Sequence, residues 1–259
     1  MATRGVASAR SRRLLYEGHR RLSPLQRAVL AVGASAMALA DPRRADLVAT
    51  VGETTAGPAL AALRDRMASC PEGRDVLARR PSVSAASLRE AALSHAEDTG
   101  VGAAGVRQGF DALLVYPVGS LGRAYHDFMH HRRFSPDDRP RVRFVDDPEL
   151  AFVMQRYREV HDFWHVLTGA PTTLEGECAL KLFEAFHTGL PMSFLAALGG
   201  PMRLAPDVRK RTILQHTPWA FQTAMRCANL MCVPYENRLA DDLSSLRREL
   251  LINVAPMAA

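Results

Sequence analysis

Residues 147–169 read DPELAFVMQRYREVHDFWHVLTG and carry the clearest helical signal in the chain. Asp147 can cap a helix, Pro148 suits its first turn, and Gly169 suits the left-handed residue that ends one. The apolar residues recur at helical spacing and share one face: Leu150, Val153, Met154, Tyr157, Val160 and Trp164. The stretch therefore predicts a long helix with one buried face.

Two histidines of this stretch have the spacing of metal ligands. Residues i and i+4 of a helix are separated by about 40°, so His161 and His165 could bind one ion. Both lie within or at the edge of the apolar face, whereas Asp162 lies beyond that edge and could join from the flank. A hydrogen-bonded core histidine would explain either one alone. Two histidines at ligand spacing beside an aspartate favour a metal site.

The next predicted helix offers a further ligand. Thr172 and Glu175 have the spacing of a capping box, and the short turn at 169–172 folds this helix back against the first. Glu177 lies early on it and is the expected fourth ligand. Histidine and carboxylate ligands without thiolate suit zinc or another first-row dication.

Lys181 and Glu184 follow Glu177 at one and two helical turns. They could be groups that support the metal ligands and assist catalysis. An exposed ion pair on the helix surface is an equally good interpretation.

A second segment repeats the pattern His-Asp-x-x-His at His126, Asp127 and His130. In a helix over 121–131 the two histidines lie opposite the apolar cluster of that helix, Leu121, Tyr125 and Phe128. They adjoin His131, Arg132 and Arg133. We therefore expect a solvated polar face here rather than a metal site.

The rest of the chain is also punctuated as helices. Helical signals cover 25–40 after Ser23-Pro24, 58–71, 75–80, 121–131 after Ser120, 208–232 with a bend at Pro218, and 237–251. The alternating run at 141–145 is too short to make a sheet. The prediction is an all-α fold, a single helical domain over 22–259, with a loop or insertion at 95–118.

Charge is concentrated at the N-terminus. The chain carries a net charge of +6, and residues 1–21 hold six arginines against one glutamate. That composition is typical of a mitochondrial transit segment, with a disordered basic tail as the alternative. The remaining residues are close to neutral, which argues against a nucleic-acid-binding body. Four scattered cysteines make no disulfide framework.

Linked motifs extend along much of the chain, over 16–94 and 117–256. They are Ser23-Pro-Leu-Gln, Gly52-Glu-Thr-Thr, FVDDPEL at 144–150, QRYREVHD at 155–162, Gly176-Glu177, KLFEA at 181–185 and HTGLPM at 187–192. Together they resemble the ubiquinone (coenzyme Q) biosynthesis proteins of the Coq-four family in its mitochondrial form. His187 departs from the glutamine expected there, segment 95–116 looks longer, and His126, Asp127 and His130 have no family counterpart.

The resemblance implies an all-helical fold with a metal motif at His161, Asp162, His165 and Glu177. It implies removal of the C1 carboxylate from a 4-hydroxy-3-methoxy-5-polyprenylbenzoate, giving a methoxy-polyprenylphenol, and binding of a long isoprenoid chain. It also implies peripheral attachment to the matrix face of the mitochondrial inner membrane, within a complex of ubiquinone-biosynthesis enzymes.

The mechanism expected from these residues uses a dication that anchors the carboxylate or polarises a bound water. That water would be the proton source, with Glu184 or Lys181 assisting. C1 then takes either a proton or an oxygen. Apolar stretches 25–40 and 191–201 could contact a membrane surface, line a groove for the tail, or form buried helices, and exposed apolar faces could bind partner enzymes or form a homodimer. Two rivals are a scaffold or lipid-presenting protein with a structural metal and a His-Asp-type phosphohydrolase. The phosphohydrolase class needs a further upstream histidine ligand.

Overall fold

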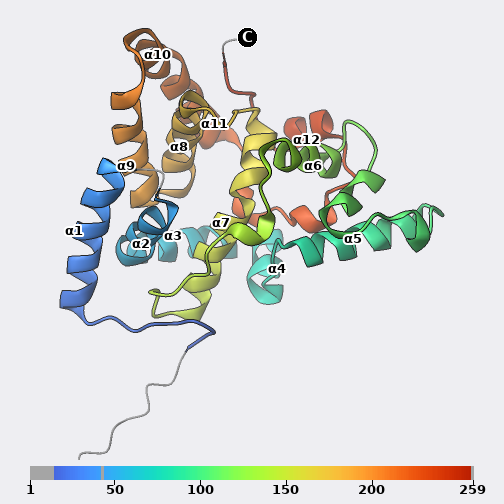
Figure 1. The fold of residues 1–259 in the computed structure, drawn as a ribbon, viewed down its shortest axis with the longest axis horizontal. Coiled ribbons are helices and arrows are strands. Elements are labelled where there is room, and N and C mark those ends of the chain that lie inside the picture. Colours follow the sequence, from blue (N-terminus) through green and yellow to red (C-terminus); the bar gives the residue numbers. More distant parts are fainter. Residues whose placement is uncertain (1–14, 42–43, 258–259) are drawn as a thin grey trace, which may run out of the picture.

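Helix α7 (Pro148–Thr168) runs through the centre of the computed structural model, which describes residues 15–41 and 44–257 (Figure 1). Asp147 Oδ1 accepts the backbone N–H groups of Glu149 and Leu150, and Gly169 ends the helix with a φ of +70°. Both predicted ends are confirmed. Fifteen of its 21 residues are buried, so α7 is enclosed on nearly every side rather than on one face.

The described residues contain twelve α-helices and no β-strand, so the predicted all-α class is confirmed. The alternating run at 141–145 forms no strand. The helices other than α7 are α1 (Pro24–Ala40), α2 (Ala45–Thr55), α3 (Gly57–Ala68), α4 (Pro71–Arg79), α5 (Ala85–Asp98), α6 (Leu121–Arg132), α8 (Leu174–Thr188), α9 (Pro191–Gly199), α10 (Pro206–Arg211), α11 (Thr217–Arg226) and α12 (Leu243–Glu249).

The predicted starts of α1 and α6 are confirmed, but others were wrong. Helix α4 begins at Pro71 rather than at 75, α12 begins at Leu243 rather than at 237, and α2 and α5 were not predicted. Ser23 and Ser120 cap α1 and α6. Thr173 rather than Thr172 caps α8, because its hydroxyl accepts the N–H of Gly176, while the hydroxyl of Thr172 accepts a hydrogen bond from Arg132. The bend expected near Pro218 is a π-helical turn at Thr212–His216, which joins α10 to α11.

The irregular segment predicted at 95–118 contains the end of α5 and two 3-10 turns, η1 (Ala103–Gly105) and η2 (Gly109–Val115). Phe110 of η2 packs edge-on against Tyr125 and stacks on His126. The segment therefore lies against α6 and covers one face of it.

Helix α1 lies at one edge of the molecule beside α9, as the blue and orange ribbons of Figure 1 show. Ala34 is its only buried residue, so the alternative of a buried helix was wrong for α1. In α9, Met192, Ser193 and Ala197 are buried, while Phe194, Leu195 and Leu198 are exposed. Among the described residues, no helix is both long and apolar enough to cross a bilayer.

The predicted transit segment 1–21 falls largely on residues 1–14, which lie outside the described residues. Within the described part of the predicted segment, Tyr16 contacts the helical body, because its hydroxyl donates to the carbonyl oxygen of Val145 at 2.8 Å. The Nε2 atom of His19 lies 3.0 Å from a carboxylate oxygen of Asp146. A transit segment that ends before Tyr16 would leave these contacts in place.

Candidate metal centre

The turn between α7 and α8 places Glu177 opposite His165. Gly169 supplies the left-handed conformation, and Gly176 permits a close approach, because a Cβ atom there would lie 2.1 Å from the carbonyl oxygen of Pro171. Contacts pair His165 with Glu177 and His161 with Glu184. The later residue of α7 therefore pairs with the earlier residue of α8, so the two helices are antiparallel.

His161, His165 and Glu177 come together as expected. Their potential ligand atoms all lie within 4.8 Å of one another, and both histidines are buried. The Nε2 atom of His165 is 3.2 Å from Oε1 of Glu177. Two ligands of a tetrahedral zinc ion are separated by about 3.3 Å, so small side-chain rotations suffice to bind one ion.

Hydrogen bonds to Nδ1 fix which nitrogen of each imidazole is free. Nδ1 of His165 is 2.8 Å from the carbonyl oxygen of Ala170, and Nδ1 of His161 is 2.5 Å from Oε1 of Glu184. Both partners only accept, so each Nδ1 carries the proton. Burial and the nearby Lys181 lower the pKa of His161, which keeps that ring neutral. Nε2 of each histidine is left as a lone-pair donor for a metal.

The polar atoms of this group fit a cation. Nε2 of His165 is buried and has no hydrogen-bond partner, yet it faces the carboxylate of Glu177. A lone pair facing an anionic oxygen is unfavourable unless a positive charge lies between them. An unperturbed glutamate carboxyl is ionised at neutral pH, and about a third of the Glu177 side chain is exposed to solvent. The carboxylate is therefore available as a ligand.

Asp162 is not part of the group whose ligand atoms lie within 4.8 Å of one another. Its carboxylate makes a bidentate ion pair with Arg139, at 2.5 and 2.6 Å from Nη2. Asp162 is buried, whereas about a third of the Arg139 side chain is exposed. Ligation by Asp162 stays a prediction, and it would require the aspartate to share or leave Arg139.

Lys181 and Glu184 lie beside His161 in a buried network. Nζ of Lys181 is 2.7 Å from Oε2 of Glu184, which also accepts hydrogen bonds from the hydroxyls of Tyr157 and Ser193. Burial opposes ionisation of Glu184, but Lys181 and His161 hold its pKa well below the usual range. Glu184 is fully buried, which excludes the alternative of an exposed ion pair.

Sequence reasoning missed three polar partners of the predicted site residues, namely Tyr157 and Ser193 beside Glu184 and Arg139 beside Asp162. Tyr157 was assigned to the apolar face of α7, although its position four residues before His161 already placed its hydroxyl near that histidine. Ser193 and Arg139 come from α9 and from the loop before α7. Neither of these two carries a local signal that links it to the histidines.

A cavity of about 810 Å³ adjoins the metal centre. Its polar lining includes His161, Asp162, Glu177 and Lys181, from α7 and α8. Most of its apolar lining lies on three other helices, with Ala38 and Leu39 on α1, Val48 and Val51 on α2, and Met192, Leu195 and Ala196 on α9. The lining also includes Phe134, Pro140, Leu174 and Cys178, and the side chains of Arg139, Arg158 and Arg203. A ligand with a polar head and an apolar tail matches this division.

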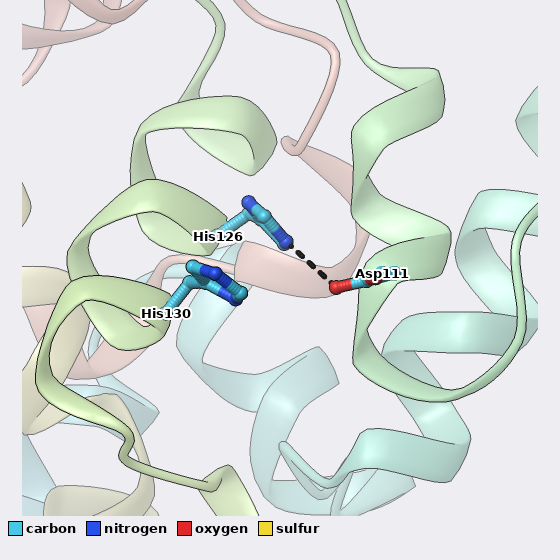
Figure 2. Close-up of side chains that lie close together, drawn as sticks. All are labelled: Asp111, His126 and His130. Atoms are coloured by element: carbon cyan, nitrogen blue, oxygen red, sulfur yellow. Dashed lines mark hydrogen bonds and ion pairs between the residues drawn. The ribbon is translucent and has the colours of Figure 1, made fainter.

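The second His-Asp-x-x-His segment lies on α6. His130 is exposed as predicted, but the expectation of a solvated face was wrong for His126, which is 4% exposed. The physical reason is η2, which covers this face and brings Asp111 to 3.1 Å from Nε2 of His126 (Figure 2). We call His126 and His130 the α6 pair, and His161 and His165 the α7 pair.

Fold and site together define an all-α protein with a candidate dication centre beside a largely apolar cavity. The sequence model described as "Coenzyme Q (ubiquinone) biosynthesis protein Coq4" matches residues 16–108 and 106–256, and the chain belongs to this family. The two matched parts meet inside the irregular segment at 95–118.

Curated relatives agree with this assignment. The chain is 43% identical over 243 residues to "Ubiquinone biosynthesis protein COQ4, mitochondrial" of Laccaria bicolor, covering 94% of this chain and 75% of the relative. It is 44% identical over 243 residues to the Homo sapiens "Ubiquinone biosynthesis protein COQ4 homolog, mitochondrial", covering 94% and 84%. A role in ubiquinone biosynthesis follows.

A solved structure shares the fold. It is the crystal structure of a Nostoc punctiforme protein described as a candidate ubiquinone biosynthesis protein, with a TM-score of 0.63 and 17% identity. The similarity covers 86% of this chain and 97% of that one.

Proposed function

We propose that the chain removes the C1 carboxylate of a 4-hydroxy-3-methoxy-5-polyprenylbenzoate, with a divalent metal, zinc in the first place, as its cofactor. One observation carries the proposal. The orphaned, buried Nε2 of His165 and the ionised Glu177 lie beside a cavity whose remaining lining is largely apolar. The metal centre would take the carboxylate head, and the apolar part would take the isoprenoid chain.

His161, His165 and Glu177 would hold the cofactor, with Asp162 as the expected fourth ligand. A bound dication supplies fixed positive charge to the substrate carboxylate. Glu184 orients His161 through Nδ1, and Ala170 does the same for His165. These contacts would leave both Nε2 atoms free to bind the ion.

Lys181 is one of the chain's own cations at this end of the cavity, together with Arg139, which is paired with Asp162. Burial lowers the pKa of Lys181, but Glu184 and Tyr157 outweigh that and raise the pKa above its usual value, so the amine is protonated. When the bond between C1 and the carboxylate breaks, carbon dioxide leaves and its bonding electron pair stays on C1. C1 then needs a proton, which Lys181 can donate, or an oxygen if the reaction is oxidative.

The tail of the substrate would enter from a membrane surface. Exposed apolar side chains lie on helices that also line the cavity, namely Leu25, Val29, Val32, Met37 and Leu39 on α1 and Phe194, Leu195 and Leu198 on α9. We place the protein peripherally on the matrix side of the mitochondrial inner membrane. Other ubiquinone-biosynthesis enzymes, or a second copy of this chain, would bind at apolar faces that the membrane leaves free.

Turnover by the purified full chain tests the proposal. The protein is stripped of metal, reloaded with Zn²⁺ and incubated with a short-chain prenylated substrate in detergent, with and without oxygen. The carbon dioxide released from the substrate and the mass of the phenol product are measured. We expect turnover only in the reloaded protein, and a loss of about 100-fold in Lys181→Met, because general acids contribute about 10²–10⁴-fold.

Two results would contradict the proposal. Binding of substrate without product in both atmospheres would support a lipid-presenting scaffold with a structural metal instead. Equal turnover in the stripped and reloaded proteins would remove the metal from the reaction.

A further inference from the structure

We propose a second metal site, formed by the α6 pair and Asp111, that fastens η2 to α6. The potential ligand atoms of His126, His130 and Asp111 lie within 4.8 Å of one another. Figure 2 shows both histidines projecting from the same side of α6 toward Asp111 on the facing segment. This inference is independent of the proposed decarboxylation.

The hydrogen bonds of His126 carry the argument. Its Nδ1 is 3.0 Å from Oδ1 of Asp127, and its Nε2 is 3.1 Å from Oδ1 of Asp111. A neutral imidazole has one N–H and one lone pair, so it cannot donate to both carboxylates. With the proton on Nδ1, the lone pair of Nε2 faces an anionic oxygen. A cation shared by Nε2 and Asp111 would remove that conflict.

His130 completes the ligand set from the next turn of the helix. Its ring stacks on that of His126, with centroids 5.3 Å apart and planes 17° apart. Because imidazole lone pairs lie in the ring planes, one ring must turn toward the other before both can bind a common ion, and the exposed His130 is free to do so. Two imidazoles and one carboxylate, with His130 exposed and Asp111 half-buried, suit Zn²⁺, Co²⁺ or Ni²⁺ with water in the open position.

Asp127 acts on this site as an orienting group. It accepts hydrogen bonds from Nδ1 of His126 and from Nε of Arg123, one turn earlier. A carboxylate behind the metal-ligating imidazole fixes the tautomer that leaves Nε2 free. The α7 pair divides these two contacts between its histidines, because Glu184 contacts Nδ1 of His161 whereas Glu177 faces Nε2 of His165.

Metal stoichiometry of the full-length protein tests the proposal. Wild type, His130→Ala and His131→Ala are stripped, titrated with Co²⁺ alone, and analysed for bound metal and for the visible absorption of Co²⁺. His131 is the matched control, because it is the exposed neighbour of His130 and its Nδ1 contacts the backbone oxygen of Asp127 instead. Both substitutions are at exposed positions and should leave the fold intact.

We expect wild type and His131→Ala to bind one more ion per chain than His130→Ala. The measured quantity is the difference in bound ions per chain between the variants. This difference does not depend on how much metal the α7 pair binds. Co²⁺ should also slow hydrogen exchange at 109–115 in wild type but not in His130→Ala, because the ion links η2 to α6. Affinity at this site should fall more than about 100-fold, since removing even an outer-shell partner costs about 10–100-fold.

Equal stoichiometry in wild type and His130→Ala would overturn the proposal. In that case a proton, rather than a metal, would lie between His126 and Asp111. Equal loss in His131→Ala would also overturn it, because the binding would then belong to exposed histidines in general.

Discussion

The two His-Asp-x-x-His segments have the same pattern but opposite surroundings. The α7 pair lies in a helix buried on nearly every side and adjoins an 810 Å³ cavity. The α6 pair lies under a short 3-10 segment, with His130 exposed. In both, a carboxylate from a neighbouring element faces Nε2 of one histidine. The spacing brings two histidines to one side of a helix, whereas the packing around them determines which other groups and ligands can reach them.

Substitution of one histidine in each pair should give the largest difference in turnover between the two pairs. His161→Ala removes a cavity-lining ligand, and we expect turnover to fall at least about 1,000-fold, since a Lewis-acid ion contributes several kcal/mol. His130→Ala removes a ligand that is remote from the cavity, and we expect it to retain turnover. Carbon dioxide release and bound metal are measured on the same preparations.

His165→Ala provides a second variant of the α7 pair, and His131→Ala provides the exposed control. If His161→Ala and His130→Ala lost turnover equally, the assignment of chemistry to the α7 pair would be wrong. Full turnover in a metal-free His161→Ala protein would reject the proposed cofactor role outright.

The aspartates within the two motifs also differ in burial. Asp162 is buried against Arg139, so Asp162→Asn leaves a guanidinium facing a neutral amide, at a cost of about 2 kcal/mol in the free energy of unfolding. Asp127 is about half-exposed, so Asp127→Asn should cost less than about 1 kcal/mol. Denaturant unfolding of the stripped proteins measures both.

Asp162→Asn also tests the predicted fourth ligand. If Asp162 binds the ion, the substitution weakens metal binding in addition to lowering stability. If Asp162 only holds Arg139, metal affinity stays at the wild-type value while the midpoint of unfolding falls. A stripped Asp162→Asn protein as stable as wild type would show that the ion pair contributes nothing to the fold.

How far the sequence could predict these sites depends on where the partner group lies along the chain. Asp147, Gly169 and the spacing of His161 and His165 are local, and the structure has them as predicted. Glu177 was predictable because a turn of a few residues can only return α8 against α7. A helical wheel, however, assigns faces within one helix and does not show what covers them. The position of Phe110 and Asp111 over His126 depends on long-range packing, and so does the pairing of Arg139 with Asp162.

His187 on α8 shows what burial alone does to a histidine, and it belongs to neither pair. Its Nε2 accepts the N–H of Leu230, and Nδ1 is 3.5 Å from Sγ of Cys227, so both nitrogens have partners without a metal. Burial, and secondly Arg66, lower the pKa of His187 to about 4. Below the unfolded-state pKa of about 6.5, the unfolded chain binds a proton that the folded chain does not. The contribution of His187 to stability is therefore complete above pH 6.5 and is lost as the pH falls toward 4.

His187→Gln should remove this dependence and is the smallest effect expected here. Glutamine does not titrate, so between pH 7.5 and pH 5.5 the variant should gain about 1 kcal/mol relative to wild type, whatever its stability at pH 7.5. Denaturant unfolding of stripped protein at both pH values gives this difference, and His131→Ala is the exposed control. Parallel pH profiles for wild type and His187→Gln would mean that the buried ring does take up a proton. Burial in this core would then not keep a histidine neutral. The neutral state assigned to His161 and His165 would no longer be supported by a second buried histidine of the same protein.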